Sequence, residues 1–503
     1  MIEINCGKVT GNIHNFWNNV HFHPTDAIED DWGRAILDSI ARDEVAETVR
    51  MYAMLEDIVT MDADGNLQYD FTENDVRLDY MMSKGFNILL TYNFLPPCLA
   101  EDSNHFQHAN KKGTRYKGKM ICTSRLKDES MWEEVCYRYT EHIVERYGIE
   151  TVEKWYLECY NEPDIPIFFV TELGHPPENS DKRAQEYMRL YRGFSRAVKR
   201  VDSRLRVGGP ATAGQWPFYE MVLELIKAEG LDFDFFSGHS YGTDPPYLND
   251  GSRPFTPDSI LERIVDYRRA LNKYFPDVEM VIDEWGASTC GFYNREECPQ
   301  LMLREGSEFA AYFGKLVEGA ISKELGISKL MICLSGQHDL PCDFSGYRNF
   351  MGLNHIKKPI YNAYALLRKL GTQRIEAKTD VKDLTVLASA DTSGGYKVML
   401  SYAAEHFDKT LPDLCDTLTL RGINGKRHIK VWCIDENHTN PYKYAKASGF
   451  GDTFTEEEIK KLREVAELLP MAEYDAELDG VAKIPVEFST NALVMIEISD
   501  IVK

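Results

Sequence analysis

Trp155-Tyr-Leu-Glu-Cys-Tyr-Asn-Glu-Pro-Asp164 and Val281-Ile-Asp-Glu-Trp-Gly286 are two stretches in which an apolar run breaks into a loop at a glutamate. The glutamates, Glu162 and Glu284, are 122 residues apart (284 − 162), which leaves room for three strand–helix repeats. In a parallel barrel the carboxyl ends of the strands gather on one face, where catalytic residues project. Two carboxylates placed there are the equipment for cleaving a glycosidic bond, because one donates a proton and the other attacks.

Short apolar runs alternate with amphipathic stretches over most of the chain. Residues 86–92 are almost continuously apolar, as a strand buried on both faces requires. Residues 182–201 instead place Tyr187, Leu190 and Phe194 at the spacing of an amphipathic helix. Eight such strand–helix pairs predict an α/β fold, the (β/α)8 TIM barrel. We expect strands near 14–20, 48–54, 86–92, 154–160, 205–209, 233–239, 278–283 and 328–334, and helices near 32–46, 73–84, 130–147, 182–201, 217–228, 257–274, 304–325 and 361–370.

The pattern changes after about residue 372. Further strand-like segments begin at Asp380, Gly395, Ile429 and Ala492 without crossover helices between them, and one helix near 455–468 interrupts them. Strands that follow one another in this way favour an antiparallel arrangement. The chain is therefore predicted to contain a catalytic barrel over 10–372 and an accessory antiparallel β-sandwich domain over 373–503, to which residues 1–9 add a strand.

Two connections of the predicted barrel have patterns of their own. Asp62-Ala-Asp-Gly-Asn66 lies between short apolar segments and predicts a surface hairpin after the second strand. Residues 95–128 form a long polar loop after the third strand. Loops of that length in a compact domain are often functional, so this one is a candidate wall for a pocket.

Charge and composition exclude several classes of partner. Lys and Arg number 57 against 80 Asp and Glu, a formal charge of −23, which repels nucleic acid and anionic membranes. No apolar run approaches the roughly 18 residues that span a bilayer. The first residues lack the basic and apolar regions of a signal peptide, and the eleven cysteines form no Cys-x-x-Cys pair. We therefore expect a cytoplasmic protein with reduced thiols.

Glu162 is the candidate acid/base. A carboxyl group that must be protonated near neutral pH needs an apolar, partly buried setting, and Trp155, Tyr156 and Tyr160 lie close by in the sequence. Asn161 can hydrogen-bond a sugar 2-hydroxyl, a contact that strengthens in an oxocarbenium-like transition state. The alternative role for Glu162 is a carboxylate at a helix N-terminus beside Pro163.

Glu284 is the candidate nucleophile and must stay ionised, which requires hydrogen-bond donors nearby. His239 and Tyr241 end the preceding predicted strand and can supply them, although His239 can equally be a core histidine. Arg50, at the end of the second strand, either orients the nucleophile or forms a structural ion pair. Period-two alternation places Asp283 opposite Glu284 as a structural partner.

Aromatic and histidine residues add two further expectations. Trp285 is a candidate for stacking on a sugar, although most aromatic side chains belong to a core. His21-Phe-His23 has the form that metal-dependent barrel hydrolases carry after the first strand. No carboxylated lysine or later histidine set accompanies it, so we expect no metal and no cofactor.

With these motifs the chain resembles the family 39 glycoside hydrolases of clan A, the group of β-xylosidases and α-L-iduronidases. Tyr160-Asn-Glu-Pro-Asp164 resembles the acid/base motif, and Asp283-Glu-Trp285 occupies the nucleophile position. The resemblance implies a retaining double displacement, in which Glu284 attacks and Glu162 serves as acid and then as base. Further resemblance lies in residues 49–57, 90–100, 239–241, 358–364 and 434–442.

The chain departs from this family's pattern in two places. The family usually has His-Gly after the second strand, where this chain has Tyr52-Ala53. The eighth strand of the family usually carries a tryptophan, which residues 330–339 lack, with Ile332 in its approximate place. Both departures fall in the expected sugar site, where Tyr52 and Asp339 are candidate substrate contacts. The catalytic pair therefore carries over, whereas specificity for xylose does not.

Three functions remain open. The leading hypothesis is an exo-acting, β-xylosidase-like glycosidase that trims oligosaccharides, with an arabinoside or uronide as alternative substrates. The second is a non-catalytic carbohydrate-binding or regulatory barrel, which the presence of Asn161 and Tyr241 beside both glutamates disfavours. The third is a metal-dependent barrel hydrolase. By analogy with the fold alone, a homo-oligomer is one expectation for the assembly.

Overall fold

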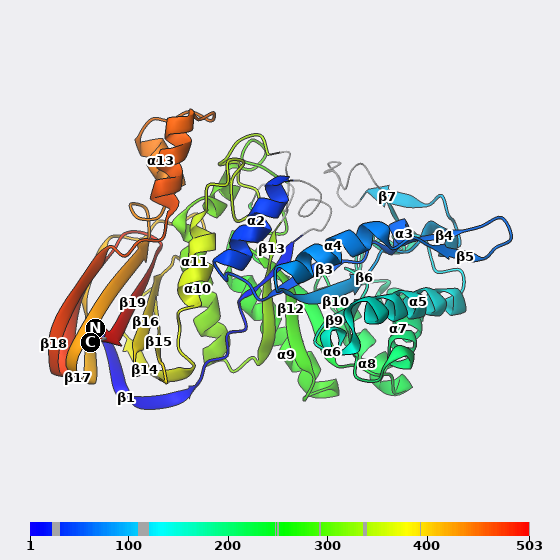
Figure 1. Ribbon diagram of the computed structural model, residues 1–503, viewed down its shortest axis with the longest axis horizontal. Helices are drawn as coiled ribbons and strands as arrows, with labels where there is room; N and C mark the ends of the chain where they lie inside the picture. Colours follow the sequence, from blue (N-terminus) through cyan, green and yellow to red (C-terminus); the bar gives the residue numbers. More distant parts are fainter. Residues whose placement is uncertain are drawn as a thin grey trace.

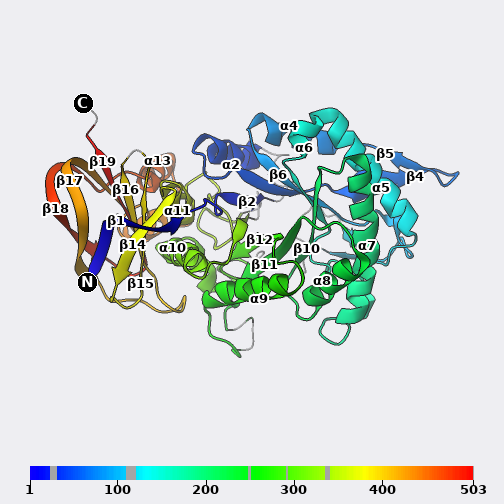
Figure 2. The same ribbon diagram turned by 90° about the horizontal axis from the view of Figure 1, so that it is seen from below.

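The computed structural model describes residues 1–22, 31–108, 120–246, 248, 251–290, 293–334, 340–392 and 394–501. Eight parallel strands form a closed barrel, which confirms the predicted TIM barrel (Figures 1 and 2). In the order in which they pair around the barrel, the strands are β2 (Asn19–Phe22), β3 (Thr48–Tyr52), β6 (Asn87–Tyr92), β9 (Tyr156–Cys159), β10 (Arg206–Thr212), β11 (Phe235–Tyr241), β12 (Glu279–Gly286) and β13 (Ile327–Leu334).

Helices surround the barrel where the sequence predicts them. In α7 (Ser180–Val201) the apolar stripe that includes Tyr187, Leu190 and Phe194 is fully buried. The helices of the barrel are α2 (Asp31–Arg42), α4 (Thr72–Ser83), α5 (Glu129–Tyr147), α7 (Ser180–Val201), α8 (Phe218–Glu229), α9 (Asp258–Tyr274), α10 (Ser307–Ser322) and α11 (Pro359–Leu367). Short helices also occur: α3 (Leu55–Ile58), α6 (Ile149–Val152), η1 (Pro97–Leu99), η2 (Thr171–Leu173) and η3 (Pro299–Arg304).

The two unusual connections are also seen. β4 (Val59–Met61) and β5 (Leu67–Tyr69) form the predicted hairpin, in which the side chain of Asp62 accepts hydrogen bonds from the backbone of Asp64 and Asn66. The long connection after β6 contains a second small hairpin, β7 (Phe106–His108) with β8 (Met120–Cys122).

An apolar layer fills the lower part of the barrel interior. Its members come from β6, β9, β11, β12 and β13 and are Leu89, Tyr156, Phe235, Val281 and Met331. These residues lie nearer the start of their strands than the candidate catalytic residues do. The polar side chains further along the strands therefore lie above a closed apolar floor, at the carboxyl end of the barrel.

The second sheet has seven strands and its own apolar core. Its order is β1 (Ile2–Asn12), β14 (Gln373–Thr379), β15 (Leu384–Ala390), β16 (Tyr396–Tyr402), β19 (Ala492–Asp500), β17 (Leu414–Ile434) and β18 (Ala472–Phe488). Residues 1–9 belong to this sheet through β1, as expected. The division of the chain at residue 372 into two folding units stays a prediction.

One pairing makes the second sheet mixed rather than purely antiparallel. The first part of β17 pairs parallel with β1, and its last part pairs antiparallel with β19. A bulge at Gly422, where φ is +79°, separates the two parts. Because a bulge bends and twists its strand, one long strand can serve both edges and curl the sheet.

The barrel and the second sheet share a packed boundary at α10, as Figures 1 and 2 show. The Ser401 hydroxyl of β16 donates a hydrogen bond to the Ala311 carbonyl of α10. A Cβ atom at Gly314 would lie 2.8 Å from Leu493 Cδ1 and 3.0 Å from Ser401 Cβ. Glycine at this position therefore allows the helix to approach the sheet closely.

An insertion between β17 and β18 contains α12 (Pro441–Ala447) and α13 (Glu456–Ala466), the helix predicted near 455–468. Thr455 and Glu458 form a capping box at the start of α13. Tyr442 and Leu462 of the insertion pack on Phe344 and Ile356, which follow β13. The insertion is thereby attached to the carboxyl-end loops of the barrel (Figure 1).

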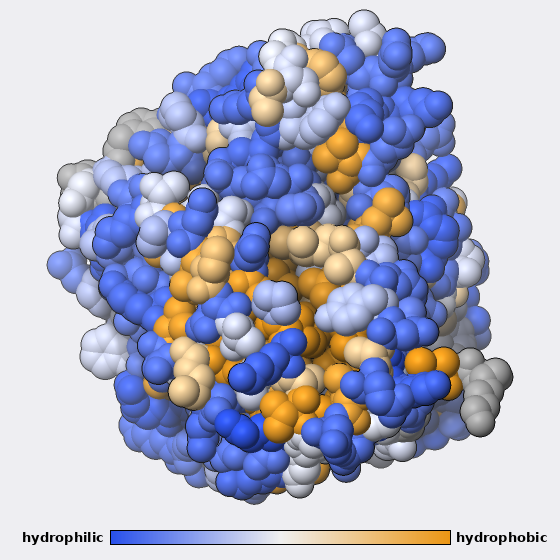
Figure 3. Space-filling model, turned by 90° about the vertical axis from the view of Figure 1, so that its left-hand side faces the viewer, coloured by the Kyte–Doolittle hydropathy of each residue, from blue (hydrophilic) through white to orange (hydrophobic). Residues whose placement is uncertain are grey.

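The end of the molecule formed by the second sheet has a mixed surface. Figure 3 shows hydrophobic atoms gathered at the centre of this face within a largely hydrophilic surround. Exposed apolar residues of β18 and the segment before it include Met471, Tyr474 and Val481. Among the described residues, no helix is both long enough and apolar enough to cross a membrane.

Candidate active site

Glu162 and Glu284 meet at the carboxyl end of the barrel through His239 of β11. His239 Nδ1 lies 2.7 Å from Glu162 Oε1 and 3.6 Å from Glu284 Oε2. One oxygen of each glutamate and one nitrogen of the histidine lie within 4.8 Å of one another. The two carboxylates that are 122 residues apart in the sequence are therefore neighbours in space.

The loop after β9 holds Glu162 in an unusual backbone conformation. Its φ of 47° lies in the left-handed region, and its N–H donates to the Ala211 carbonyl over 3.0 Å. Buried Asp164 anchors the same loop, because its carboxylate accepts hydrogen bonds from the Thr212 hydroxyl at 2.6 Å and the Ala213 N–H at 2.9 Å. Strained backbone held by its surroundings is common at functional sites.

A bulge in β12 corrects the expected position of Asp283. Ser237 pairs with Val281 and His239 with Glu284, so β12 holds one more residue than β11 over this interval. The extra residue interrupts the period-two alternation, and Asp283 reaches His239 Nε2 at 3.1 Å. Asp283 and Glu284 consequently both contact the polar centre instead of pointing to opposite sides.

Glu284 is held as a carboxylate by three neighbours. Arg50 Nη1 donates to Oε1 at 2.8 Å, the Tyr241 hydroxyl donates to Oε2 at 2.5 Å, and His21 Nδ1 lies 3.0 Å from Oε1. Burial alone would raise the pKa of Glu284, but His239, His21 and Arg50 hold it well below its ordinary value. A group in this state is ready to act as a nucleophile.

The pKa of Glu162 is shifted in the opposite direction. Burial raises its pKa above the ordinary value, and the charge of Glu284 adds to that increase, although the contact with His239 opposes it. Two neighbouring carboxylates whose pKa values are pushed apart are the mark of an acid beside a base.

His239 is the cation between these carboxylates. Burial lowers its pKa, but the charges of Glu284, Asp283 and Glu162 outweigh burial and hold that pKa well above its ordinary value. The imidazolium makes close contacts with Glu162 at one nitrogen and Asp283 at the other. The two roles expected for His239, donor to the site and satisfied buried histidine, are thus combined.

Arg50 combines the two roles considered for it. It is fully buried, and besides Glu284 it donates to Glu158 Oε2 at 2.7 Å and to Asn161 Oδ1 at 2.9 Å. One guanidinium therefore orients the candidate nucleophile, the asparagine beside the candidate acid/base, and a buried carboxylate.

Glu158, below the site, was missed by sequence reasoning. Burial raises its pKa to about 7, against the lowering effect of Arg50. The Thr91 hydroxyl also donates to its Oε2 at 2.7 Å. Period two places Glu158 on the same face of β9 as Tyr156, which is the signal that identifies it as inward-facing.

Tyr52 lies in the site, as expected of a candidate substrate contact. His21 and Arg348 also lie there, and the sequence did not identify either of them as a neighbour of the substrate. The Tyr52 ring centroid is 5.2 Å from that of His21 and 5.3 Å from the Arg50 guanidinium carbon. Burial lowers the pKa of His21 to about 4, so its ring is neutral at pH 7. Arg348 Nη1, from the segment after β13, donates to the Tyr241 hydroxyl at 3.0 Å.

The structure places Trp285 away from the site, which corrects the expectation that it stacks on a sugar. Its ring is fully buried against Phe313 of α10, and Nε1 donates to the Tyr364 hydroxyl of α11 at 3.1 Å. Because Glu284 faces inward, the next residue of the strand faces the surrounding helices. Asp339, the other expected substrate contact, lies outside the described residues.

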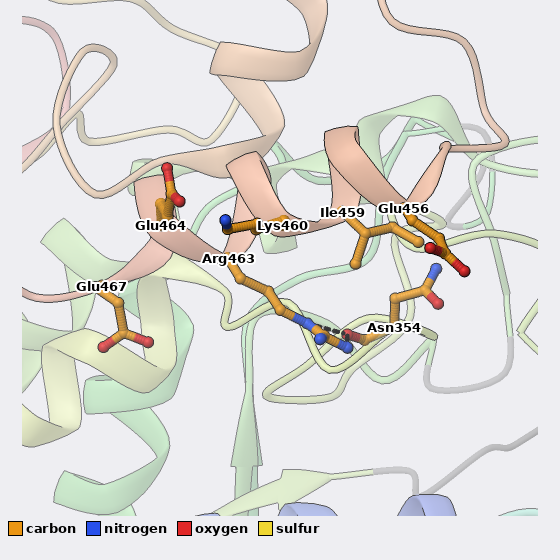
Figure 4. A pocket seen from close by; sticks show the side chains of 7 residues that line it. All are labelled: Asn354, Glu456, Ile459, Lys460, Arg463, Glu464 and Glu467. Atoms are coloured by element: carbon orange, nitrogen blue, oxygen red, sulfur yellow. Dashed lines mark hydrogen bonds between the residues drawn. The ribbon is translucent and has the colours of Figure 1, made fainter.

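A separate pocket of about 590 Å³ lies beside α13 (Figure 4). Arg463 crosses it and donates to the Asn354 carbonyl at 2.7 Å. Among the described residues that line it, none is aromatic; they are Asn354, Glu456, Ile459, Lys460, Arg463, Glu464 and Glu467. The pocket therefore lacks the aromatic platform on which a sugar would stack.

A closed (β/α)8 barrel with a carboxylate pair of opposed pKa at its carboxyl end is the arrangement that barrel glycosidases use. The chain belongs to glycosyl hydrolases family 39, whose model matches residues 1–480.

Individual relatives agree with this assignment. A β-xylosidase of Caldicellulosiruptor saccharolyticus is 27% identical over 93% of this chain and 91% of its own length. A β-xylosidase of Geobacillus stearothermophilus is 23% identical over 90% of this chain and 86% of its own. The crystal structure of a monomeric β-xylosidase from Caulobacter crescentus has a TM-score of 0.81 at 20% identity, covering 100% of this chain and 99% of that one.

Proposed function

We propose that this glycoside hydrolase is a retaining, exo-acting enzyme of the β-xylosidase type, with Glu284 as nucleophile and Glu162 as acid/base. The observation that carries the proposal is the separation of the two carboxylates, whose nearest described oxygens lie within 4.8 Å. Retaining enzymes have carboxyl groups about 5–5.5 Å apart, whereas inverting enzymes need about 6.5–9.5 Å for a water molecule.

The first step follows from the charges of the site. Glu284 attacks the anomeric carbon while Glu162 transfers its proton to the leaving oxygen. Arg50 and Tyr241 hold the two oxygens of Glu284 before the attack. Asn161, positioned by Arg50, is available for the 2-hydroxyl of the sugar.

The second step reverses the role of Glu162. Once Glu284 is esterified it carries no charge, so its contribution to the raised pKa of Glu162 disappears. The pKa of Glu162 therefore falls, and Glu162 is a carboxylate in this step. In that form it can accept a proton from the attacking water. Loss of one charge thus converts the acid of the first step into the base of the second.

A uronide is the alternative substrate, and Arg348 favours it. The β-xylosidase-type substrate is neutral, whereas the Arg348 guanidinium brings a further positive charge beside Tyr241 and the proposed nucleophile. Arginine is the side chain best suited to bind a carboxylate with two parallel hydrogen bonds.

A panel of aryl glycosides tests the proposal: xylosides, arabinosides, glucosides, galactosides, fucosides and uronides. We expect hydrolysis of a xyloside by the wild type and none by Glu284→Ala. Proton NMR of the first-formed sugar should show the anomeric configuration of the substrate. Inversion would refute the retaining mechanism, and cleavage of the uronide alone would identify the alternative substrate.

The acid/base role has a separate test. Glu162→Ala should slow substrates with poor leaving groups far more than activated aryl glycosides, because a good leaving group needs little protonation. The matched control is Glu172→Ala, which removes a carboxylate from the neighbouring η2 and should leave both classes of substrate unaffected. Equal slowing of all substrates by Glu162→Ala would remove Glu162 from the acid role.

A further inference from the structure

A small cavity lies beside the site, between the carboxyl ends of β12 and β13 and the first turns of α10 and α11. Its volume is about 10 Å³, which is room for one particle about the size of a water molecule. Arg304, Arg348 and Asn349 supply most of its polar surface, and apolar side chains such as Phe309 and Ile332 supply the rest. Among the described residues that line the cavity, none is a carboxylate.

Arg304 brings a buried positive charge to this cavity. Its side chain belongs to a residue that is only 3% exposed, and its terminal nitrogens donate to the carbonyls of Cys290 at 2.9 Å, Gly346 at 3.1 Å and Ser288 at 3.2 Å. Carbonyl groups satisfy hydrogen bonds but do not neutralise the charge. Burial and the charge of Arg348 lower the pKa of Arg304 to about 10, so it is still a cation at pH 7.

A buried arginine is normally paired with an anion. Within the part of the chain that the structure describes, Arg304 forms no ion pair, and Asp244 raises its pKa only from a longer distance. The Asp244 carboxylate instead accepts hydrogen bonds from the hydroxyls of Ser288 and Thr289. The charge of Arg304 therefore has no direct counterpart among these residues.

Asn349 is a second sign that the cavity has an occupant. The residue is 4% exposed, and neither its side-chain nitrogen nor its oxygen has a hydrogen-bond partner among the described residues. A buried amide left without partners is costly, so such a group usually contacts a bound molecule or ion. Cys333 adds no negative charge, because burial raises the pKa of its thiol to about 12.

We propose that this cavity binds a chloride ion, held by Arg304, Arg348 and the amide of Asn349. Two guanidinium groups and an amide N–H donor suit an anion, and the first turns of α10 and α11 add partial positive charge. The volume excludes sulfate, phosphate and carboxylates, which are much larger. Chloride is only slightly larger than water, and its weak hydration suits a lining that is partly apolar.

The ion would be linked to the proposed nucleophile through Arg348. Arg348 Nη1 donates to the Tyr241 hydroxyl at 3.0 Å, and that hydroxyl donates to Glu284 Oε2 at 2.5 Å. An anion on the other side of Arg348 fixes the guanidinium and thereby the Tyr241 hydroxyl. Chloride is thus an activator of hydrolysis, an effect that rests on the proposed roles of Tyr241 and Glu284.

Bromide replaces chloride and is located by its anomalous scattering, so crystals of the full chain grown in sodium bromide test the site. We expect one anomalous peak in the cavity. Asn349→Leu removes the amide at nearly constant volume and should lower the bromide occupancy. The matched control is Asn18→Leu, because both side-chain polar atoms of Asn18 are also buried without partners. Asn18 precedes β2 at the opposite end of the barrel, so this variant should keep the peak.

A kinetic measurement tests the activating role. With an aryl glycoside that the enzyme hydrolyses, kcat/KM should be at least about fivefold higher in sodium chloride than in sodium methanesulfonate of equal ionic strength. Methanesulfonate is too large for the cavity. The dependence on chloride should weaken in Asn349→Leu and persist in Asn18→Leu, and thermal melting checks that both variants are folded.

A cavity that holds only water in bromide-grown wild-type crystals would overturn the proposal. An Asn349→Leu crystal with the full wild-type peak, or an Asn18→Leu crystal without one, would also contradict it. A rate that is the same in chloride and methanesulfonate would refute the activating role. Failure to hydrolyse any glycoside would refute the proposed function, whereas the bromide peak tests the anion site without any turnover.

Discussion

Replacing Tyr241 by phenylalanine removes one donor from the proposed nucleophile and keeps the ring. The hydroxyl donates to Glu284 Oε2 at 2.5 Å and accepts from Arg348 Nη1 at 3.0 Å. A hydrogen bond to a charged group contributes about 1.5–3 kcal/mol. Since about 1.4 kcal/mol corresponds to a tenfold change in rate, we expect kcat/KM for an aryl glycoside to fall about 10- to 150-fold.

The same substitution has a signature in the pH profile. The hydroxyl stabilises ionised Glu284, so its removal raises the pKa of that group. As the proposed nucleophile, Glu284 must be ionised to attack, so the acidic limb of kcat/KM should move to higher pH. In the same proposal the alkaline limb reflects loss of the Glu162 proton, and it should move little.

Tyr92→Phe is the matched control for Tyr241→Phe. The Tyr92 hydroxyl is buried and hydrogen-bonded at 2.8 Å to the Thr140 hydroxyl of α5, so it faces the helix layer. Both variants should melt at a lower temperature than the wild type, but only Tyr241→Phe should change kcat/KM and the acidic limb. A Tyr241→Phe enzyme with wild-type kcat/KM and pH profile would refute this account of the nucleophile.

Three further predictions concern stability. Gly314→Ala should lower the free energy of unfolding by about 1–3 kcal/mol, because the new Cβ atom clashes with the second sheet. The control is Gly11→Ala, which should change this free energy little because its Cβ atom meets nothing within 4 Å. Urea denaturation measures both variants. Glu158→Gln removes a group whose pKa is raised in the folded protein to about 7. The wild type should therefore lose stability relative to Glu158→Gln as the pH rises from the pKa of Glu158 in the unfolded chain towards 7. A difference in stability that does not depend on pH would contradict the raised pKa of Glu158. Trp285→Phe should lower the melting temperature but leave kcat/KM nearly unchanged, and a large loss of kcat/KM would place Trp285 in the sugar site after all.

Local pattern was sufficient for the order of elements. The apolar runs and amphipathic stripes predict all eight barrel strands and their helices. Both signals depend only on the spacing of apolar residues over a short stretch of sequence. The loop breaks at Glu162 and Glu284 also place the carboxylates at strand ends. Those positions follow from the sequence because a barrel gathers all its strand ends on one face.

The contacts within the site were less accessible to sequence reasoning. Strict alternation assigns Asp283 to the wrong side, because a bulge depends on how two neighbouring strands pair. Arg348 follows the last strand and has no motif that marks it, yet it reaches Tyr241. The parallel pairing of β1 with β17 likewise joins segments more than 400 residues apart in the sequence.

The sequence alone therefore determined the barrel, the presence of a second β domain and the two strand ends that carry carboxylates. Only the tertiary structure decided that Glu284 is an anion and that Glu162 has a raised pKa. A pKa depends on burial and on charges a few ångströms away. For these glutamates the charges come from Arg50, His239 and one another, which are remote along the chain and are brought together only when the barrel closes.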